Sequence, residues 1–214
     1  MAGDDAVTER ERDAYAYDRH VFLYYKNPDS WAPNSDADPL VERFASTWKA
    51  RKNKMTRKTL ITVCEECKDF DFSDGDALVF PERFKYSGLV ESNLESFFNR
   101  VLLNCEPWHP GACGVLTRSY VYVSAHSDTF LNIIHTFKKE IAHRQMNNEI
   151  SVTACSHLGW HKHPGDVLIY CRGPLRRTIG HWYYSVSPDD VPDILDQHIA
   201  KGEVIQWLPG LVFF

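Results

Sequence analysis

Short apolar runs separated by polar turns recur along the chain and predict a mixed α/β fold. Runs typical of buried strands occur at residues 20–25, 59–64, 77–80, 84–87, 120–123, 150–154, 167–171 and 181–186. Residues 40–52 and 128–144 carry apolar side chains at helical spacing instead. Capping signals at Ser92 and Ser187 predict further helices over 92–104 and 187–200.

The same order of elements occurs twice: strand, helix, three strands, helix. The residues agree as well, because I-T-V-C at 61–64 aligns with V-T-A-C at 152–155, and G-D-A-L-V-F at 75–80 aligns with G-D-V-L-I-Y at 165–170. The sequence therefore predicts an α/β protein with mixed sheets, built from two tandem thioredoxin-like βαβ-ββα units. The predicted division is a flexible lead-in over 1–18, an N-terminal domain over 19–114 and a C-terminal domain over 115–214.

Composition narrows the classes of function. A chain of 214 residues with 43% hydrophobic residues and a net charge of −5 is typical of a soluble globular protein. It has no strongly basic face for nucleic acid, no run of about 20 apolar residues for a membrane span, and no secretory signal. Six cysteines are too few for a secreted disulfide scaffold of this length, so we expect reduced thiols and a cytoplasmic location. Hydrolase and nucleotide-binding motifs are missing from the sequence, which favours an electron carrier or a non-enzymatic protein over a hydrolase.

The candidate chemistry lies in a loop between two predicted strands, at residues 154–166. Cys155, His157, His161 and His163 fall within nine residues there. On a helical turn, His157 and His161 would point the same way and could share one metal ion. Imidazole and thiolate ligands suit zinc, copper or an iron–sulfur cluster. The alternative interpretation is a pair of surface histidines in a loop.

The remaining cysteines offer a weaker signal. Cys64 and Cys67 form a C-x-x-C motif, but it follows the second strand, and the acidic residues around it would raise a thiol pKa. We therefore expect ordinary thiols there, with a thiol oxidoreductase as an alternative function. Cys105 and Cys113 flank the predicted domain boundary and are either linker thiols or supplementary ligands.

Several motifs together resemble the sucrase/ferredoxin-like family, and its plant members in particular. They are A-C-S-H-L-G-W-H-K at 154–162, G-D-V-L-I-Y at 165–170, G-H-W-Y at 180–183, P-D-D-V at 188–191 and G-E-V-I at 202–205. The N-terminal half resembles the family at 18–23, 44–46, 49–53 and 73–76. The resemblance implies a thioredoxin-like 2Fe–2S ferredoxin that transfers electrons to an unidentified redox or protein partner.

The resemblance also implies a cluster held by two cysteines and two histidines. The family's His-x-x-x-His motif falls on His157 and His161, but Ser124 stands at the position of the first cysteine. The loop after Ser124 is shortened, and the second cysteine is missing. Three alternatives follow: other cysteines substitute, a single ion such as zinc binds with Cys155 and His126 as further ligands, or the chain is a cofactor-free interaction module.

Overall fold

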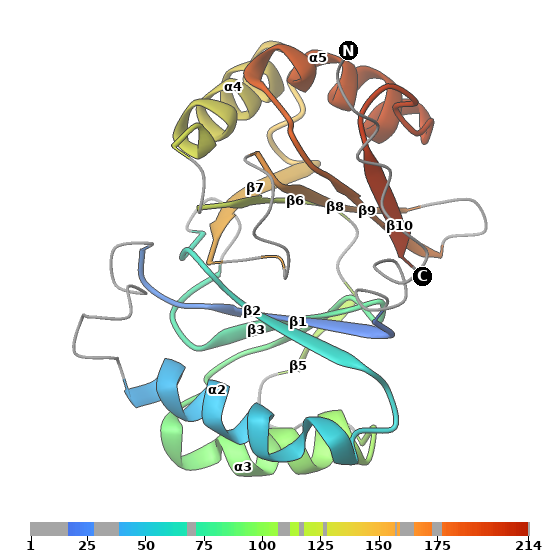
Figure 1. Ribbon diagram of the computed structural model, residues 1–214. Helices are drawn as coiled ribbons and strands as arrows, with labels where there is room; N and C mark the ends of the chain where they lie inside the picture. The colour runs from blue at the N-terminus through green and yellow to red at the C-terminus, as the bar shows by residue number, and fades with distance from the viewer. Residues whose placement is uncertain are drawn as a thin grey trace.

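Within the part of the chain that the computed structural model describes, ten strands form a single mixed sheet with helices on its outer sides (Figure 1). The structure describes residues 17–27, 39–67, 72–106, 112–115, 118–125, 128–156, 158, 165–172 and 177–213. The strands are β1 (Arg19–Tyr24), β2 (Thr59–Cys64), β3 (Asp76–Phe80), β4 (Phe84–Tyr86), β5 (Ala112–Val115), β6 (Ser119–Ser124), β7 (Ile150–Cys155), β8 (Val167–Arg172), β9 (Thr178–Tyr183) and β10 (Gly210–Phe213). The helices are α2 (Pro39–Arg51) with η2 (Lys52–Lys54), α3 (Leu94–Phe97) between η4 (Glu91–Asn93) and η5 (Phe98–Leu103), α4 (Phe130–His143), and α5 (Val191–Asp193) between η7 (Pro188–Asp190) and η8 (Ile194–Ile199).

Strand order and pairing sense are the same in the two halves of the sheet. The N-terminal half runs β2-β1-β3-β4 and the C-terminal half runs β7-β6-β8-β9. In each half the first two strands of the chain are parallel, and the later pairs are antiparallel. The two halves are joined through β2 and β7, which pair antiparallel at the single position Cys64–Cys155.

The halves lie face to face, so the molecule has four layers: helices, half-sheet, half-sheet, helices (Figure 1). Helices α2 and α3 cover the outer side of one half-sheet, and α4 and α5 cover the other. The central strands are therefore buried on both faces, as β1, β3 and β7 are along their whole length. This explains why β1 and β3 contain continuous apolar runs, whereas β7 alternates apolar residues with small polar ones that are also buried.

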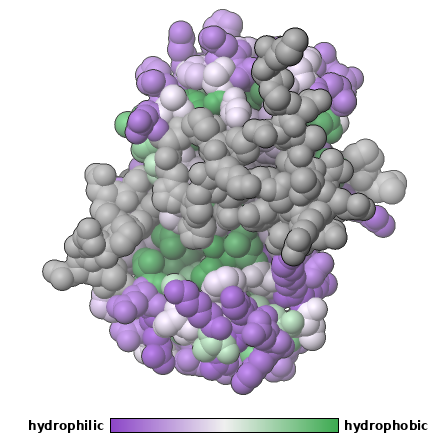
Figure 2. All heavy atoms as spheres, in the orientation of Figure 1, coloured by the Kyte–Doolittle hydropathy of each residue, from purple (hydrophilic) through white to green (hydrophobic). Residues whose placement is uncertain are grey.

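The two faces of each central strand carry different side chains. In β1, Val21 and Leu23 pack under the helices, while Phe22 and Tyr24 point toward the other half-sheet. The same alternation holds in β3, β6 and β8. The core between the half-sheets, which we call the inter-sheet core, is consequently rich in aromatic rings. Figure 2 shows hydrophilic side chains over both outer layers and apolar surface in a recess between the halves.

Stacked rings join the two half-sheets. Phe22 stacks on Tyr122 with ring centroids 3.7 Å apart, and Phe80 stacks on Tyr170 at 3.9 Å. The Tyr122 hydroxyl lies 2.9 Å from the Tyr24 hydroxyl, so the polar ends of these buried rings satisfy each other. Each such aromatic pair contributes about 0.5–1.5 kcal/mol beyond the area it buries.

The structure changes several predicted boundaries. Residues 112–115, predicted to lie at the domain boundary, form β5, and the last four described residues form β10, which the pattern did not predict. The strand predicted at 181–186 is β9 and begins three residues earlier, at Thr178. In the described residues no helix is long and apolar enough to cross a bilayer.

Candidate functional site

The ends of β6 and β7 and the start of β8 meet at one end of the C-terminal half-sheet. Ser124 and Cys155 are register partners on the parallel strands β6 and β7. The Ser124 N–H donates to the Asp166 carbonyl at 3.0 Å, and the Ala125 N–H donates to the Cys155 carbonyl at 2.9 Å. Ser124, Cys155 and Asp166 are all buried. The predicted histidine loop therefore begins and ends here.

The predicted ligands His157, His161 and His126 lie outside the described residues, as does His163, so their role as ligands stays a prediction. Leu158 is described, and it is buried in the inter-sheet core. Its side chain anchors the start of the loop between the two half-sheets.

The described donors at this end do not fit a 2Fe–2S cluster, which needs four protein ligands that are usually thiolates. Ser124 brings a buried alcohol to the position where the resemblance implies a thiolate. Cys155 belongs to the inter-sheet core and faces Cys64. Across the described ranges, no three His, Cys, Asp or Glu side chains converge as a metal site requires.

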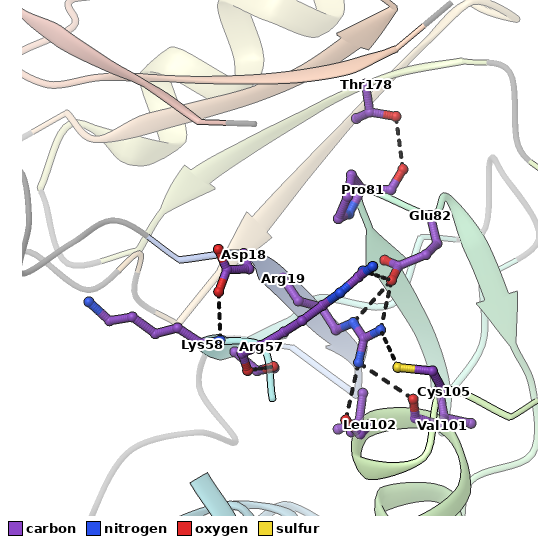
Figure 3. Close-up of polar contacts among 11 residues, drawn as sticks. Asp18, Arg19, Arg57, Lys58, Pro81, Glu82, Val101, Leu102, Cys105 and Thr178 are labelled. Atoms are coloured by element: carbon purple, nitrogen blue, oxygen red, sulfur yellow. Dashed lines mark hydrogen bonds and ion pairs between the residues drawn. The ribbon is translucent and has the colours of Figure 1, made fainter. Parts of the chain in front are cut away.

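The other described cysteine side chains lie apart from this end. Cys105 follows η5 in the N-terminal half, where Arg19 Nη2 donates to its sulfur at 3.6 Å (Figure 3). Cys171 Sγ lies 3.6 Å from His198 Nε2 under the outer helices. Cys113 lies on β5, paired with Lys85 of β4, also in the N-terminal half. Both Cys105 and Cys113 belong to the N-terminal half, and their role as supplementary ligands stays a prediction because the histidines lie outside the described residues.

The C-x-x-C motif does not lie at a helix N-terminus. Cys64 ends β2 in the inter-sheet core, and Cys67 forms an isolated bridge with Phe72 and has its sulfur 3.7 Å from Ser151 Oγ. Burial raises the pKa of the Cys64 thiol well above its ordinary value, with smaller contributions from Cys155, Cys67 and Glu65. Burial thus acts more strongly on this thiol than the neighbouring carboxylate does.

Asp166 is the most unusual ionisable group near the loop. It lies directly before β8, and its Oδ1 atom has no hydrogen-bond partner among the described residues. Burial raises the pKa of the carboxyl to about 7, and the Trp182 indole lowers it by less. At neutral pH this site therefore holds a carboxyl group poised between its charged and neutral forms.

The N-terminal half has a cation at the position where Asp166 has none among the described residues. Asp76 precedes Leu78 by two residues, just as Asp166 precedes Leu168. Lys85 on β4 is the register partner of Leu78, and it forms an ion pair with Asp76 at 2.8 Å. In the C-terminal half the register partner of Leu168 is Trp182, so an indole replaces the ammonium group. Asp166 was not among the site residues predicted from the sequence. Trp182 and Lys85 hold the same register position in the two halves, opposite Leu168 and Leu78.

A second cluster lies on the outer face of the C-terminal half-sheet. His198 Nδ1 is 2.6 Å from the Tyr183 hydroxyl, and the His181 and His198 rings meet edge to face at 4.3 Å. Burial lowers the pKa of His181 to about 4 and that of His198 to about 3. Both imidazoles are therefore neutral at physiological pH and belong to the core under α5.

The mixed sheet and its outer helices define an α/β protein. The sequence matches the sucrase/ferredoxin-like family over residues 11–208, nearly the whole chain. The chain belongs to that family.

The chain is also similar to individual proteins of known sequence or structure. A 2Fe–2S ferredoxin of Clostridium pasteurianum is 30% identical over 83 residues, which cover 39% of this chain and 74% of the ferredoxin. Altered inheritance of mitochondria protein 32 of Debaryomyces hansenii is 29% identical over 76 residues, and this chain spans 26% of its length. A solved thioredoxin-like 2Fe–2S ferredoxin from Aquifex aeolicus aligns with a TM-score of 0.36 at 19% identity, covering 44% of this chain and 90% of that one.

Proposed function

We propose that this chain is a sucrase/ferredoxin-like protein whose electron-transfer site is degenerate, so that it acts without a stoichiometric 2Fe–2S cluster. The observation that carries the proposal is Ser124. Its side chain is buried at the end of β6, and a neutral alcohol is a poor substitute for the thiolate ligands that iron–sulfur clusters use.

The number of available ligands supports the same conclusion. His157 and His161 supply two ligands at most. The cysteines whose side chains are described have other neighbours, since Cys64, Cys67 and Cys155 lie in the inter-sheet core and Cys171 contacts His198. A mononuclear zinc site would need Cys155 to leave the core, so its position does not favour that alternative.

We further infer that the halves are two copies of one thioredoxin-like unit, with the boundary near residue 114. Equal strand order supports this, and so do the contacts between the halves. Phe22 meets Tyr122, Phe80 meets Tyr170 and Cys64 meets Cys155, and each pair joins equivalent positions of the two copies. Contact between equivalent residues is the mark of a two-fold, isologous interface.

With a degenerate electron-transfer site, the proposed role is that of a protein-binding module whose partner is a redox protein or another protein.

Iron and sulfide analysis of the freshly purified, unmodified chain tests the proposed function, together with its visible absorption spectrum. We expect a colourless protein or substoichiometric iron and sulfide, with no further loss in His157→Ala or His161→Ala. Ser124→Cys is the matched gain-of-ligand variant, and it should not restore a full cluster because the second thiolate is still missing. Stoichiometric iron and sulfide in the unmodified chain, lost in both histidine variants, would overturn the proposal.

A further inference from the structure

The only backbone pairing between the half-sheets in the described chain places two cysteines opposite each other. Cys64 ends β2, and Cys155 ends β7. On one side of the pair the Glu65 N–H donates to the Ala154 carbonyl at 2.9 Å, and on the other the Ser156 N–H donates to the Val63 carbonyl at 2.7 Å. These two hydrogen bonds lie on either side of the pair, and neither of them uses a backbone group of Cys64 or Cys155. Cys64 and Cys155 therefore form a non-hydrogen-bonded antiparallel pair.

This kind of pair brings side chains closest together. Its Cα atoms are about 4.5 Å apart in regular sheets, and both side chains point to the same face. Disulfides span Cα separations of about 4.4–6.8 Å, so the pair lies within their range. Both cysteines belong to the inter-sheet core and are 0% exposed. Neither thiol needs a backbone rearrangement to reach the other.

The C-x-x-C motif gives a competing pair, and the structure favours the cross-strand one. Cys67 is held in its own bridge with Phe72, with its sulfur against Ser151. Cys155 is the register partner of Cys64 on the neighbouring strand, so the backbone places these two cysteines side by side.

We propose that Cys64 and Cys155 are an oxidisable pair that closes to a disulfide between the two halves of the chain, with a peroxide as the oxidant. One thiolate attacks the peroxide O–O bond, becomes a sulfenic acid and releases one water after proton uptake. The second thiolate then attacks the sulfenic sulfur, forms the S–S bond and releases a second water. Two thiols are oxidised, and one hydrogen peroxide is reduced to two waters. The inference requires Cys155 to stay in the inter-sheet core, where the structure places it, rather than to bind a metal at the histidine loop.

The structure also indicates that this oxidation is slow. Both cysteines are 0% exposed, so a peroxide does not reach either sulfur while the core is closed. Only one residue pair joins β2 and β7, and we expect peroxide to reach the sulfurs through a local opening of this bridge and of the aromatic core around it. Oxidation should therefore be slower than that of the exposed Cys105 and should be accelerated by low concentrations of urea.

The test uses the full, unmodified chain treated with hydrogen peroxide, then alkylated and digested without reductant. We expect a linked peptide pair containing Cys64 and Cys155, and a faster-migrating band on a non-reducing gel. Cys64→Ala and Cys155→Ala should each lose the band, while Cys67→Ala and Cys171→Ala, two other buried cysteines, should keep it. A Cys64–Cys67 link, or separate oxidation of Cys64 and Cys155 without a link, would overturn the proposal. Because the mapping needs no substitution, it stands even where a variant fails to fold.

Discussion

Replacement by asparagine is expected to have opposite effects on the stability of the fold at Asp166 and at Asp76. Asp166 has no cation beside it in the described chain, and its carboxyl pKa is raised from 3.8 to about 7 by burial. Because the folded pKa lies above the unfolded one, ionising Asp166 destabilises the fold. The cost is absent below about pH 4, grows as the pH rises, and is complete above about pH 7. At about 1.4 kcal/mol per pKa unit, it reaches about 4 kcal/mol.

Asp166→Asn removes this charge while keeping the shape of the side chain. The buried amide retains an incompletely satisfied polar group, which costs about 1–3 kcal/mol. We therefore expect the variant to be more stable than the parent by about 1–3 kcal/mol at pH 8 and not more stable at pH 4. Asp76→Asn is the matched control: it leaves Lys85 buried without its ion-pair partner, 2.8 Å away, and should destabilise by about 3 kcal/mol.

Urea unfolding followed by circular dichroism at pH 4, 6 and 8 measures both variants. The reasoning rests on the sign of the Asp166→Asn effect and on its growth with pH. If Asp166→Asn destabilises at pH 8 as Asp76→Asn does, the carboxylate is stabilised as an anion and the argument is refuted.

Two further predictions use the C-terminal half. His181 and His198 have folded pKa values below the unfolded value, so their contribution to stability is complete above about pH 6.5 and is lost as the pH falls toward 4 and 3. His181→Phe should lower the slope of unfolding free energy against pH by about 1.4 kcal/mol per unit in that window, and an unchanged slope would contradict it. Gly165→Ala should destabilise more than Gly202→Ala in thermal unfolding, since both have positive φ but only the first places a Cβ 2.2 Å from the Val186 carbonyl oxygen. Equal losses would show that the close approach does not matter.

Local pattern was enough to predict most of the strands and helices. The runs at 59–64 and 167–171 are strands because apolar and β-branched residues pack well on both faces of a covered sheet. What the sequence could not show was how the halves meet. The bridge between Cys64 and Cys155 and the stacking of Phe80 on Tyr170 are contacts between distant residues, and no periodicity encodes them.

The candidate site was predicted in part. The histidine motif and the departure at Ser124 are visible in the sequence, whereas the burial of Cys155 and the unbalanced charge of Asp166 depend on neighbours across strands. Cys155 looked available as a ligand because it is two residues from His157. A side chain at the end of a strand can point to either face, and here it points into the inter-sheet core.

The aromatic face between the half-sheets has a consequence for synthesis of the chain. The N-terminal half can pair its own strands once β4 has been made, but its Phe22 and Phe80 rings are covered by Tyr122 and Tyr170, which emerge later. At ribosomal rates of about 5–20 residues per second, this apolar face stays uncovered for on the order of 10 s. During that interval the nascent chain exposes the Phe22 and Phe80 rings, and exposed apolar surface of this kind favours aggregation until the second half covers it.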